Sequence, residues 1–200
     1  MRVKICGITN LNDAMDAINA GADALGFVFY DKSPRYIDPQ DAKKIIDKIP
    51  PFVQTVGLFV NMNAPQIDFI CKRSTVDVAQ IIQENTDVKF YKSLQTRHID
   101  VLRVQKKEDL ENLDKEKYYL VDAFVEGYGG AGKRIAIDWF DDIDCTNLII
   151  AGGLTSDNLK ELKGYNFYGV DVSSGVEKAK GIKDKQKIIN FVNSANELSQ

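Results

Sequence analysis

The sequence predicts an α/β protein that folds as a single (β/α)8 barrel domain over residues 1–200, a closed ring of eight parallel strands with helices outside. Three observations favour this class. Short β-branched and aromatic runs alternate with amphipathic stretches about eight times along the chain. No linker or shift in composition divides the chain. Glycine turns gather after the last two strands, where barrels of this kind bind phosphate.

The expected strands are short apolar runs of the kind that parallel sheets bury on both faces. In chain order they are 2–5, 24–29, 55–60, 76–81, 100–104, 118–124, 148–151 and 167–172. Eight units in this chain leave about 25 residues for each, which is near the lower limit for a barrel. An open doubly wound sheet is the alternative, but it calls for a glycine-rich turn after the first strand, and residues 6–13 contain one glycine.

Amphipathic stretches separate most of these strands. Apolar side chains recur at helical spacing in residues 12–20, 39–49, 64–73, 156–162 and 184–198. Asp184 is well placed to cap the last of these helices. The charged stretch 106–117 is interpreted as a solvated helix whose Leu110 and Leu113 face inward.

Composition excludes several classes of function. The chain has 26 Lys+Arg against 29 Asp+Glu, a net charge of −3, so neither nucleic acid nor an anionic membrane is an expected partner. No apolar run approaches the roughly 18 residues of a membrane span, and the first residues do not resemble a secretion signal. Three cysteines without a CxxC pair and a single histidine, His98, indicate the reducing cytoplasm and argue against a zinc site.

Two late glycine turns are candidates for a phosphate site. Gly152-Gly153 follows the seventh expected strand and Ser174-Gly175 follows the eighth, and each leads towards an expected helix. Glycines at a helix start let backbone N–H groups approach a phosphate, whose charge the helix dipole favours. Glycine turns also arise for steric reasons alone, but two of them in neighbouring units favour a phosphate site.

A third glycine-rich segment resembles a nucleotide-binding loop. Residues 127–133 match the pattern GxxxxGK, but Arg134 stands where such a loop needs Ser or Thr to hold magnesium. We therefore interpret 127–132 as a mobile lid over the sixth strand, with nucleotide binding as the rival hypothesis.

Ionisable side chains at the carboxyl ends of the strands are candidates for catalysis, because those ends face the active site of a barrel. Cys6 ends the first strand, either as a small buried hydrophobe or as a thiolate stabilised by the helix that follows. Asp122 lies in an apolar strand, where burial raises a carboxyl pKa, unless loop N–H groups satisfy it. Asp171 makes the same case more weakly. Arg35 could bind a carboxylate with its guanidinium fork, or form a surface salt bridge.

Taken in order, the motifs resemble the phosphoribosylanthranilate isomerase family of the phosphate-binding TIM-barrel superfamily. The resemblance runs from residue 2 to about residue 190. It rests on VKICGIT (3–9), GADALGFVF (21–29), KSPRYI (32–37), VGLFVN (56–61), LVDA (120–123), GGAGK (129–133), IDWF (137–140), IIAGGLTSDN (149–158) and GVDVSSGVE (169–177). KICGIT and KSPRYI are specific to the family, whereas sister barrels share the glycine turns.

The resemblance implies an isomerase of tryptophan biosynthesis that needs neither cofactor nor metal. Its reaction is the Amadori rearrangement of N-(5-phosphoribosyl)anthranilate to 1-(2-carboxyphenylamino)-1-deoxyribulose 5-phosphate. The site residues that the resemblance implies are Cys6 as general base, Asp122 as general acid, Arg35 for the anthranilate carboxylate, Asp171 as a substrate-facing acid, and Gly152, Gly153, Ser174 and Gly175 for the phosphate. The expected partner is this small phosphorylated substrate, and the chain is expected to be a monomer or a homodimer.

The implied chemistry suits these residue types. A neutral acid must protonate the furanose ring oxygen to open the ring to an iminium form. A base must then take the C2 proton and give an enolamine that becomes the ketone. A raised pKa for Asp122 and a lowered pKa for Cys6 would set the acid and the base apart near neutral pH.

One segment departs from the family pattern. Where the family has Gln-x-His-Gly after the fourth strand, this chain has Gln80-Ile81-Ile82-Gln83. His98 falls just before the fifth strand, so we expect it at the opposite, stability face as a structural residue. Two rivals remain: a sister sugar-phosphate isomerase of histidine synthesis, which has an aspartate where Cys6 stands, and a non-catalytic phosphate-binding barrel.

Overall fold

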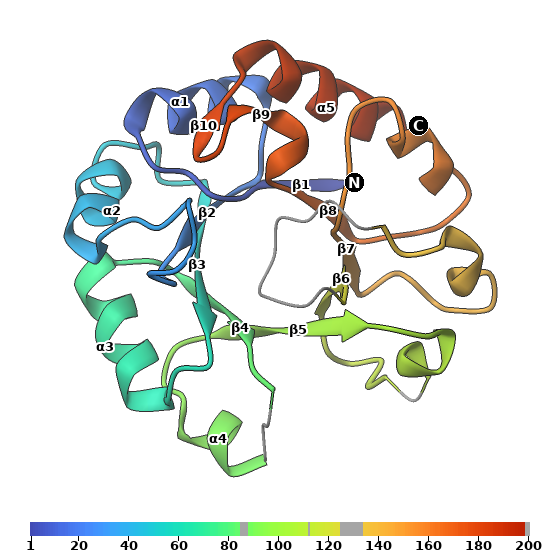
Figure 1. The fold of residues 1–200 in the computed structure, drawn as a ribbon, viewed down its shortest axis with the longest axis horizontal. Coiled ribbons are helices and arrows are strands. Elements are labelled where there is room, and N and C mark those ends of the chain that lie inside the picture. Colours follow the sequence, from blue (N-terminus) through green and yellow to red (C-terminus); the bar gives the residue numbers. More distant parts are fainter. Residues whose placement is uncertain (85–87, 112, 125–133, 199–200) are drawn as a thin grey trace.

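The strands of the computed structural model close into a barrel, and the residues that the structure describes are 1–84, 88–111, 113–124 and 134–198. The eight strands follow one another around the ring in sequence order, and β8 pairs with β1. Figure 1 shows the ring of strands with helices around its outside. The predicted barrel is confirmed, and the open doubly wound sheet is wrong.

The strands lie within two residues of the predicted positions. They are β1 (Arg2–Ile5), β2 (Ala24–Val28), β3 (Gln54–Val60), β4 (Val78–Ile82), β5 (His98–Val104), β6 (Tyr119–Ala123), β7 (Leu148–Ile150) and β8 (Gly169–Val172). All eight neighbouring pairs are parallel, and the register places Lys4 opposite Asp171 and Arg103 opposite Asp122. The register therefore brings an oppositely charged partner next to Lys4 and next to Arg103.

The α-helices of the described chain are amphipathic, and side chains define where most of them begin. They are α1 (Leu11–Ala20), α2 (Pro39–Ile46), α3 (Ala64–Ser74), α4 (Val88–Ser93) and α5 (Lys185–Glu197). Asn10, Asp38, Asn63 and Asp184 each accept a backbone N–H as N-caps, so the predicted Asp184 cap is confirmed. The first and last long helices, α1 and α5, lie side by side (Figure 1). None of the helices in the described chain is long and apolar enough to cross a membrane.

The remaining connections contain 3-10 turns rather than α-helices. They are η1 (Lys107–Leu110), η2 (Ile137–Phe140), η3 (Leu159–Leu162) and η4 (Ser174–Val176), with a hairpin of β9 (Glu177–Ala179) and β10 (Ile182–Lys183) after β8. Short connections of this kind explain how so few residues complete eight units.

Two predicted helices, 106–117 and 156–162, are therefore wrong beyond a single 3-10 turn. The Asp109 carboxylate accepts the N–H groups of Gln105 and Lys106, and the Asn158 side chain bonds to Thr155 and Gly153. Such side-chain bonds occupy the backbone groups that a helix would use. The inward packing of Leu110 and Leu113 is confirmed.

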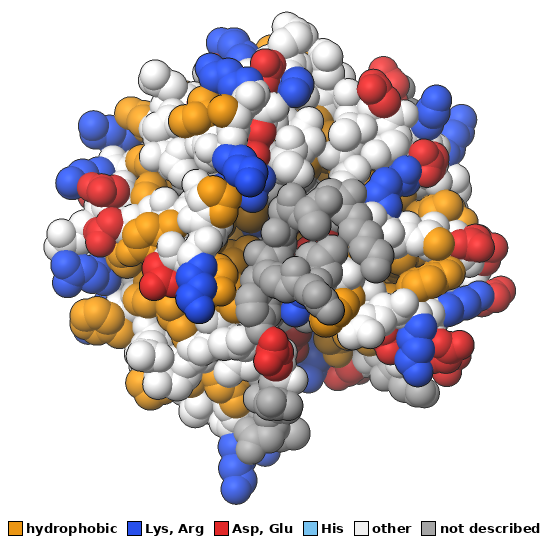
Figure 2. All heavy atoms as spheres, viewed as in Figure 1, with side chains coloured by type: hydrophobic (Ala, Val, Ile, Leu, Met, Phe, Trp, Pro, Cys, Tyr) orange, Lys and Arg blue, Asp and Glu red, His pale blue; other side chains and the backbone are white. Residues whose placement is uncertain are grey.

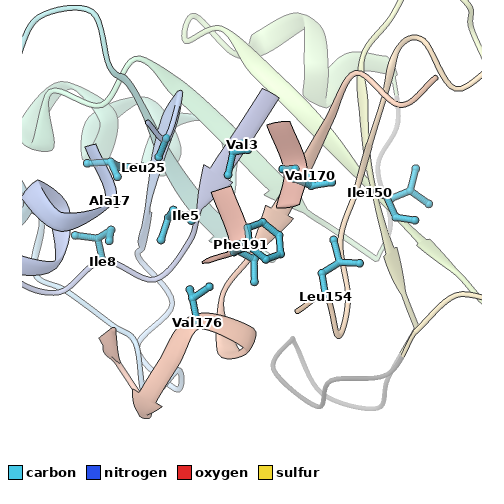
Figure 3. Packing of buried hydrophobic residues seen from close by; sticks show 14 of the residues in the cluster. Val3, Ile5, Ile8, Ala17, Leu25, Ile150, Leu154, Val170, Val176 and Phe191 are labelled. Carbon is cyan, nitrogen blue, oxygen red and sulfur yellow. The ribbon is translucent and has the colours of Figure 1, made fainter. Parts of the chain in front are cut away.

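The hydrophobic core lies between the outer face of the barrel and the helices. Val3 and Ile5 of β1, Val170 of β8 and Phe191 of α5 pack there, each at most 1% exposed (Figure 3). Burying one such side chain contributes about 1.5–3 kcal/mol. Because strand side chains alternate between faces, the residue between Val3 and Ile5, Lys4, points into the barrel instead. The outer face of β1 thus packs in the hydrophobic core, and its inner face carries a charged side chain.

Charge is spread evenly on the face of the molecule shown in Figure 2. Lys and Arg side chains alternate there with Asp and Glu around the perimeter, without a large patch of one sign. This distribution agrees with a net charge of −3, and it offers no basic surface on this face for a nucleic-acid backbone.

Candidate active site

A buried ion pair joins the first and last strands inside the barrel. Lys4 Nζ donates to Asp171 Oδ1 at 2.8 Å, and the two side chains are 9% and 10% exposed. Buried charges are costly unless they are paired, and a buried pair in a barrel interior is a mark of a functional site. The sequence analysis selected Asp171 but missed Lys4. A lysine between Val3 and Ile5 in a buried strand was the available signal.

Cys6 lies directly after β1, beside this ion pair. It is 5% exposed, and its amide donates to the Val172 carbonyl at 2.8 Å. A Cβ atom added to Gly26 of β2 would lie 2.9 Å from Cys6 Sγ and 3.0 Å from Lys4 Nζ. The thiol and the ammonium therefore meet over the bare backbone of Gly26, and the two groups interact electrostatically.

The electrostatics of Cys6 differ from the sequence expectation. Burial raises the pKa of the Cys6 thiol, the Lys4 ammonium opposes this, and Asp171 adds to the rise. The predicted lowering of this pKa is therefore wrong in the structure. Helix α1 begins at Leu11, five residues after Cys6, and is not among the influences that set this pKa. The charges that favour a thiolate come from Lys4 and, more weakly, Lys183.

Asp122 behaves as the sequence predicts. It lies on β6, and its pKa is raised from 3.8 to about 6, by burial first and by the nearby Asp171 carboxylate second. The Ala123 N–H, Arg103 and Lys4 partly offset this rise. A carboxyl group with such a pKa is protonated in a useful fraction of molecules near neutral pH and can act as an acid.

Arg35 is part of a buried cluster rather than a surface salt bridge. Its Nε and Nη2 donate to the two carboxylate oxygens of Glu177, each at 2.7 Å, and Arg35 is 8% exposed. Lys183 Nζ donates to the same carboxylate at 3.0 Å and to the Ser173 carbonyl at 3.1 Å. Burial alone would raise the pKa of Glu177, but Arg35 and Lys183 lower it below its ordinary value.

This cluster ties the loop after β2 to the hairpin and turn after β8. Sequence analysis missed both Glu177 and Lys183. Glu177 closes the motif GVDVSSGVE, so an acid at the end of a quoted motif was the available signal. Lys183 stands next to the predicted cap Asp184 and has no comparable signal in the sequence.

The structure brings the two candidate phosphate turns together. A Cβ atom on Gly175 would lie 1.9 Å from the carbonyl oxygen of Leu154, so the turn after β8 packs directly on the turn after β7. Gly152 and Gly153 have φ values of 88° and 61°, which L side chains rarely adopt. Neither turn opens an α-helix, so the predicted contribution of a helix dipole is wrong.

The segment 80–83, which departs from the family pattern, begins within strand β4. Gln80 belongs to β4 and is 3% exposed, and its Oε1 has no hydrogen-bond partner among the described residues. Gln83 follows the strand, and its Oε1 is likewise unpaired within the described chain. The segment 127–133, expected as a lid or a P-loop, lies outside the described residues.

The amino ends of the strands form a cavity of about 850 Å³ at the opposite face, and Lys4 is among the residues that line it. His98 lines it and stacks on Tyr91 at a ring-centroid distance of 5.3 Å, so its predicted position at this face is confirmed. Phe52, which is 98% exposed, lies at the same end. Cys6 and Asp122 do not line this cavity, so it is not the candidate active site.

The candidate active site therefore unites Cys6, Asp122, Asp171 and the glycine turns at the carboxyl ends of the strands. Within the described ranges, no three His, Cys, Asp or Glu side chains are grouped to hold a metal ion. A thiol beside an ammonium, together with a carboxyl group of raised pKa in the same barrel interior, suits proton transfer in both directions.

The family model described as N-(5'phosphoribosyl)anthranilate (PRA) isomerase matches residues 3–194. The chain belongs to the phosphoribosylanthranilate isomerase family. The resemblance drawn from its motifs is thus confirmed, and the sister isomerase of histidine synthesis is set aside.

Several relatives carry the same family name. The N-(5'-phosphoribosyl)anthranilate isomerase of a Sulfurovum species is 54% identical over 99% of this chain and 100% of its own length. That of a Nitratiruptor species is 54% identical over 98% of each chain. The solved phosphoribosylanthranilate isomerase of Thermotoga maritima superposes with a TM-score of 0.89, at 35% identity, over 98% of this chain and 99% of its own.

A further solved phosphoribosylanthranilate isomerase is described in complex with reduced 1-(o-carboxyphenylamino)-1-deoxyribulose 5-phosphate. It has a TM-score of 0.84 and 34% identity, covering 98% of this chain and 99% of its own. The family fold therefore accommodates a phosphorylated ligand that also carries a carboxylate.

Proposed function

We propose that this chain isomerises N-(5-phosphoribosyl)anthranilate, with Asp122 as general acid and Cys6 as general base. The observation that carries the proposal is the site at the ends of β1 and β6. There, a buried thiol lies next to the Lys4 ammonium, and a carboxyl has a pKa of about 6. An acid and a base of these types are what the rearrangement requires.

The reaction follows from the two roles. Protonated Asp122 gives its proton to the furanose ring oxygen, the C1–O bond breaks, and the anilino nitrogen becomes an iminium. Ionised Cys6 then removes the proton from C2, and the electron pair of that C–H bond neutralises the iminium. The resulting enolamine tautomerises to the ketone, so atoms and charge balance without an external oxidant or reductant.

The remaining predicted residues would hold the substrate. The backbone of Gly152, Gly153, Ser174 and Gly175 would bind the phosphate, and Asp171 would face the sugar. Arg35 would bind the anthranilate carboxylate with the N–H groups that Glu177 leaves available, because a guanidinium has five donors. The phosphorylated ligand of a solved relative supports this division.

The same chemistry needs neither cofactor nor metal, and we infer the cytoplasm as the compartment. Its support is that Cys6, Cys71 and Cys145 are all free thiols. A monomer or a homodimer is expected. Exposed Phe52 favours the homodimer, and one solved Thermotoga maritima structure, with a TM-score of 0.85, is described as monomers generated from a dimeric phosphoribosylanthranilate isomerase. Light scattering would decide between these states.

The proposed activity is tested by following the fluorescence of freshly made phosphoribosylanthranilate. Wild type is expected to accelerate its decay beyond spontaneous breakdown and to yield the rearranged product. Cys6→Ser and Asp122→Asn should each lose activity by orders of magnitude with folding intact, whereas Cys145→Ser, a control at a buried thiol outside the site, should retain it. Binding of a product analogue without any wild-type acceleration would instead support the non-catalytic barrel.

A further inference from the structure

We propose that Lys4 is a positioning residue for this reaction: its ammonium, held by Asp171 beside the Cys6 sulfur, increases the fraction of that sulfur in the ionised form that can act as a base. The inference rests on the proposed function. It concerns a residue that lies within the quoted motif VKICGIT but has no role in the acid–base assignment.

The first support is the geometry of the ammonium. Lys4 Nζ is fixed by the 2.8 Å bond to Asp171 Oδ1, and both side chains are about nine-tenths buried. The strand register places the two residues directly opposite each other on β1 and β8. The lysine has therefore lost the mobility that it would have on a surface, and its charge stays at one place in the barrel.

The second support is the position of the sulfur. Cys6 Sγ and Lys4 Nζ both border the space over Gly26, 2.9 Å and 3.0 Å from the point where a Cβ atom would stand. Cys6 directly follows β1, and a spacing of two residues in extended chain places side chains on one face, so the backbone brings the Lys4 ammonium to the same side as the thiol. Gly26 keeps the space between the two strands free of a side chain that would separate them.

The third support is the set of groups that act on the pKa of Cys6. Burial raises the pKa of Cys6, the Asp171 carboxylate raises it further, and the pKa stays above its ordinary value even with Lys4 in place, so without the ammonium the ionised fraction would be smaller still. Lys4 is the largest opposing influence, followed by Lys183 of β10. An ammonium beside a buried sulfur acts in a medium of low dielectric constant, where charges interact more strongly than in water.

Several charged groups face this pair besides its own two members. Cys6 faces Lys4, Asp171, Lys183 and the Arg35 guanidinium. Asp122 faces Asp171, Arg103 and again Lys4. Lys4 therefore lowers the pKa of both the base and the acid. Its removal is expected to shift the whole bell-shaped pH profile of kcat/KM to higher pH.

The test measures the thiol directly as well as the reaction. Alkylation of Cys6 by iodoacetamide, followed by mass spectrometry across pH, reports its ionisation, and Cys71 and Cys145 are internal controls in the same chain. In Lys4→Met the alkylation midpoint should rise by about one pH unit or more, which is about a tenfold loss of thiolate at a fixed pH below the midpoint. In Lys4→Arg the alkylation midpoint should return most of the way to the wild-type value. In Arg2→Met, at the exposed end of the same strand, the midpoint should be unchanged.

A purely structural lysine would lower activity without moving either profile, and an unmoved Cys6 midpoint in folded Lys4→Met would overturn the proposal. If the unpaired Asp171 prevents folding, the double variant Lys4→Met/Asp171→Asn, which buries no lone charge, is compared with Asp171→Asn. A higher midpoint in the double variant supports the role of the ammonium, and equal midpoints reject it. Absence of isomerase activity in wild type would reject the proposed function instead, because the alkylation midpoint needs no substrate.

Discussion

Glu177 binds Arg35 with both carboxylate oxygens, each 2.7 Å from a guanidinium nitrogen, and the same carboxylate holds the fully buried ammonium of Lys183. One carboxylate therefore pairs with two cations, Arg35 from the loop after β2 and Lys183 from β10. This arrangement orients the arginine that would bind the substrate carboxylate, and it also stabilises the fold around the turn after β8.

The first prediction concerns this acid. Glu177→Gln should lower the free energy of unfolding by about 3–5 kcal/mol, because two buried cations lose their counter-charge. KM should rise more than kcat falls, since Arg35 loses its orientation rather than the acid–base pair. Urea unfolding and steady-state kinetics measure the two effects. Asp41→Asn, which removes the exposed partner of Lys44, is the control and should leave both almost unchanged. Equal stability of the two variants would contradict the prediction.

The second prediction concerns stability and pH at Asp122. Its folded pKa of about 6 lies above the ordinary 3.8, so the folded state binds a proton more tightly than the unfolded chain. This contribution is fully present below pH 3.8 and is lost as pH rises to about 6. Asp122→Asn has no carboxyl group to titrate, so it does not lose this stability as pH rises. The loss in wild type is at most about 3 kcal/mol, because each unit of pKa shift is equivalent to about 1.4 kcal/mol.

Urea unfolding at pH 4 and at pH 8 checks this effect. The stability of Asp122→Asn relative to wild type should be higher at pH 8 than at pH 4. A difference that is the same at both pH values would mean that the carboxyl titrates alike in the folded and unfolded chain.

The third prediction concerns the contact between the two glycine turns. Gly175→Ala would place a Cβ atom 1.9 Å from the Leu154 carbonyl oxygen, so the two turns must separate. Overpacking of this kind costs about 3 kcal/mol, and KM should rise because the phosphate turns move. Gly164→Ala is the matched control: its φ of 97° makes the change cost about 1–2 kcal/mol, but its Cβ meets nothing within 4 Å and KM should stay constant. An unchanged KM in Gly175→Ala would show that these turns do not carry the phosphate.

The fourth prediction separates the two faces of the barrel wall. Gly26→Ala would insert a Cβ between Cys6 Sγ and Lys4 Nζ, so kcat should fall at least about tenfold, which is about 1.4 kcal/mol in the barrier. Gly57→Ala would press on the ring of Phe29, 2.8 Å away in the outer core. It should cost stability and spare kcat in the molecules that remain folded. Similar kcat values for both variants would speak against the closeness of thiol and ammonium as the important feature.

Strand alternation explains why so much of the barrel could be predicted. Parallel strands buried on both faces need runs of apolar residues, and these runs are visible in the sequence. The carboxyl in the apolar β6 segment could be recognised for the same reason, since nothing but burial was needed to raise its pKa. The 3-10 connections could not be predicted from the spacing of apolar residues. The side chains of Asp109 and Asn158 accept hydrogen bonds from nearby backbone N–H groups, and apolar spacing gives no sign of such bonds.

Contacts between distant residues account for the remaining surprises. Lys4 lies next to Asp171, and Arg35 next to Glu177, only because the ring closes. A sequence pattern can indicate that a thiol ends a strand, but the groups around that thiol come from β8 and β10. The direction of the Cys6 pKa depends on those groups, so it was wrong in prediction while the direction for Asp122 was right.

The pairing of β1 with β8 also has a consequence for folding of the nascent chain during synthesis. Asp171 is synthesised 167 residues after Lys4. Until then the lysine has no buried counter-charge, and the first strand has a neighbour on one side only. The nascent protein therefore gains its closed wall and its chemistry together, once β8 has been made, and a chain that stops before residue 171 should have neither.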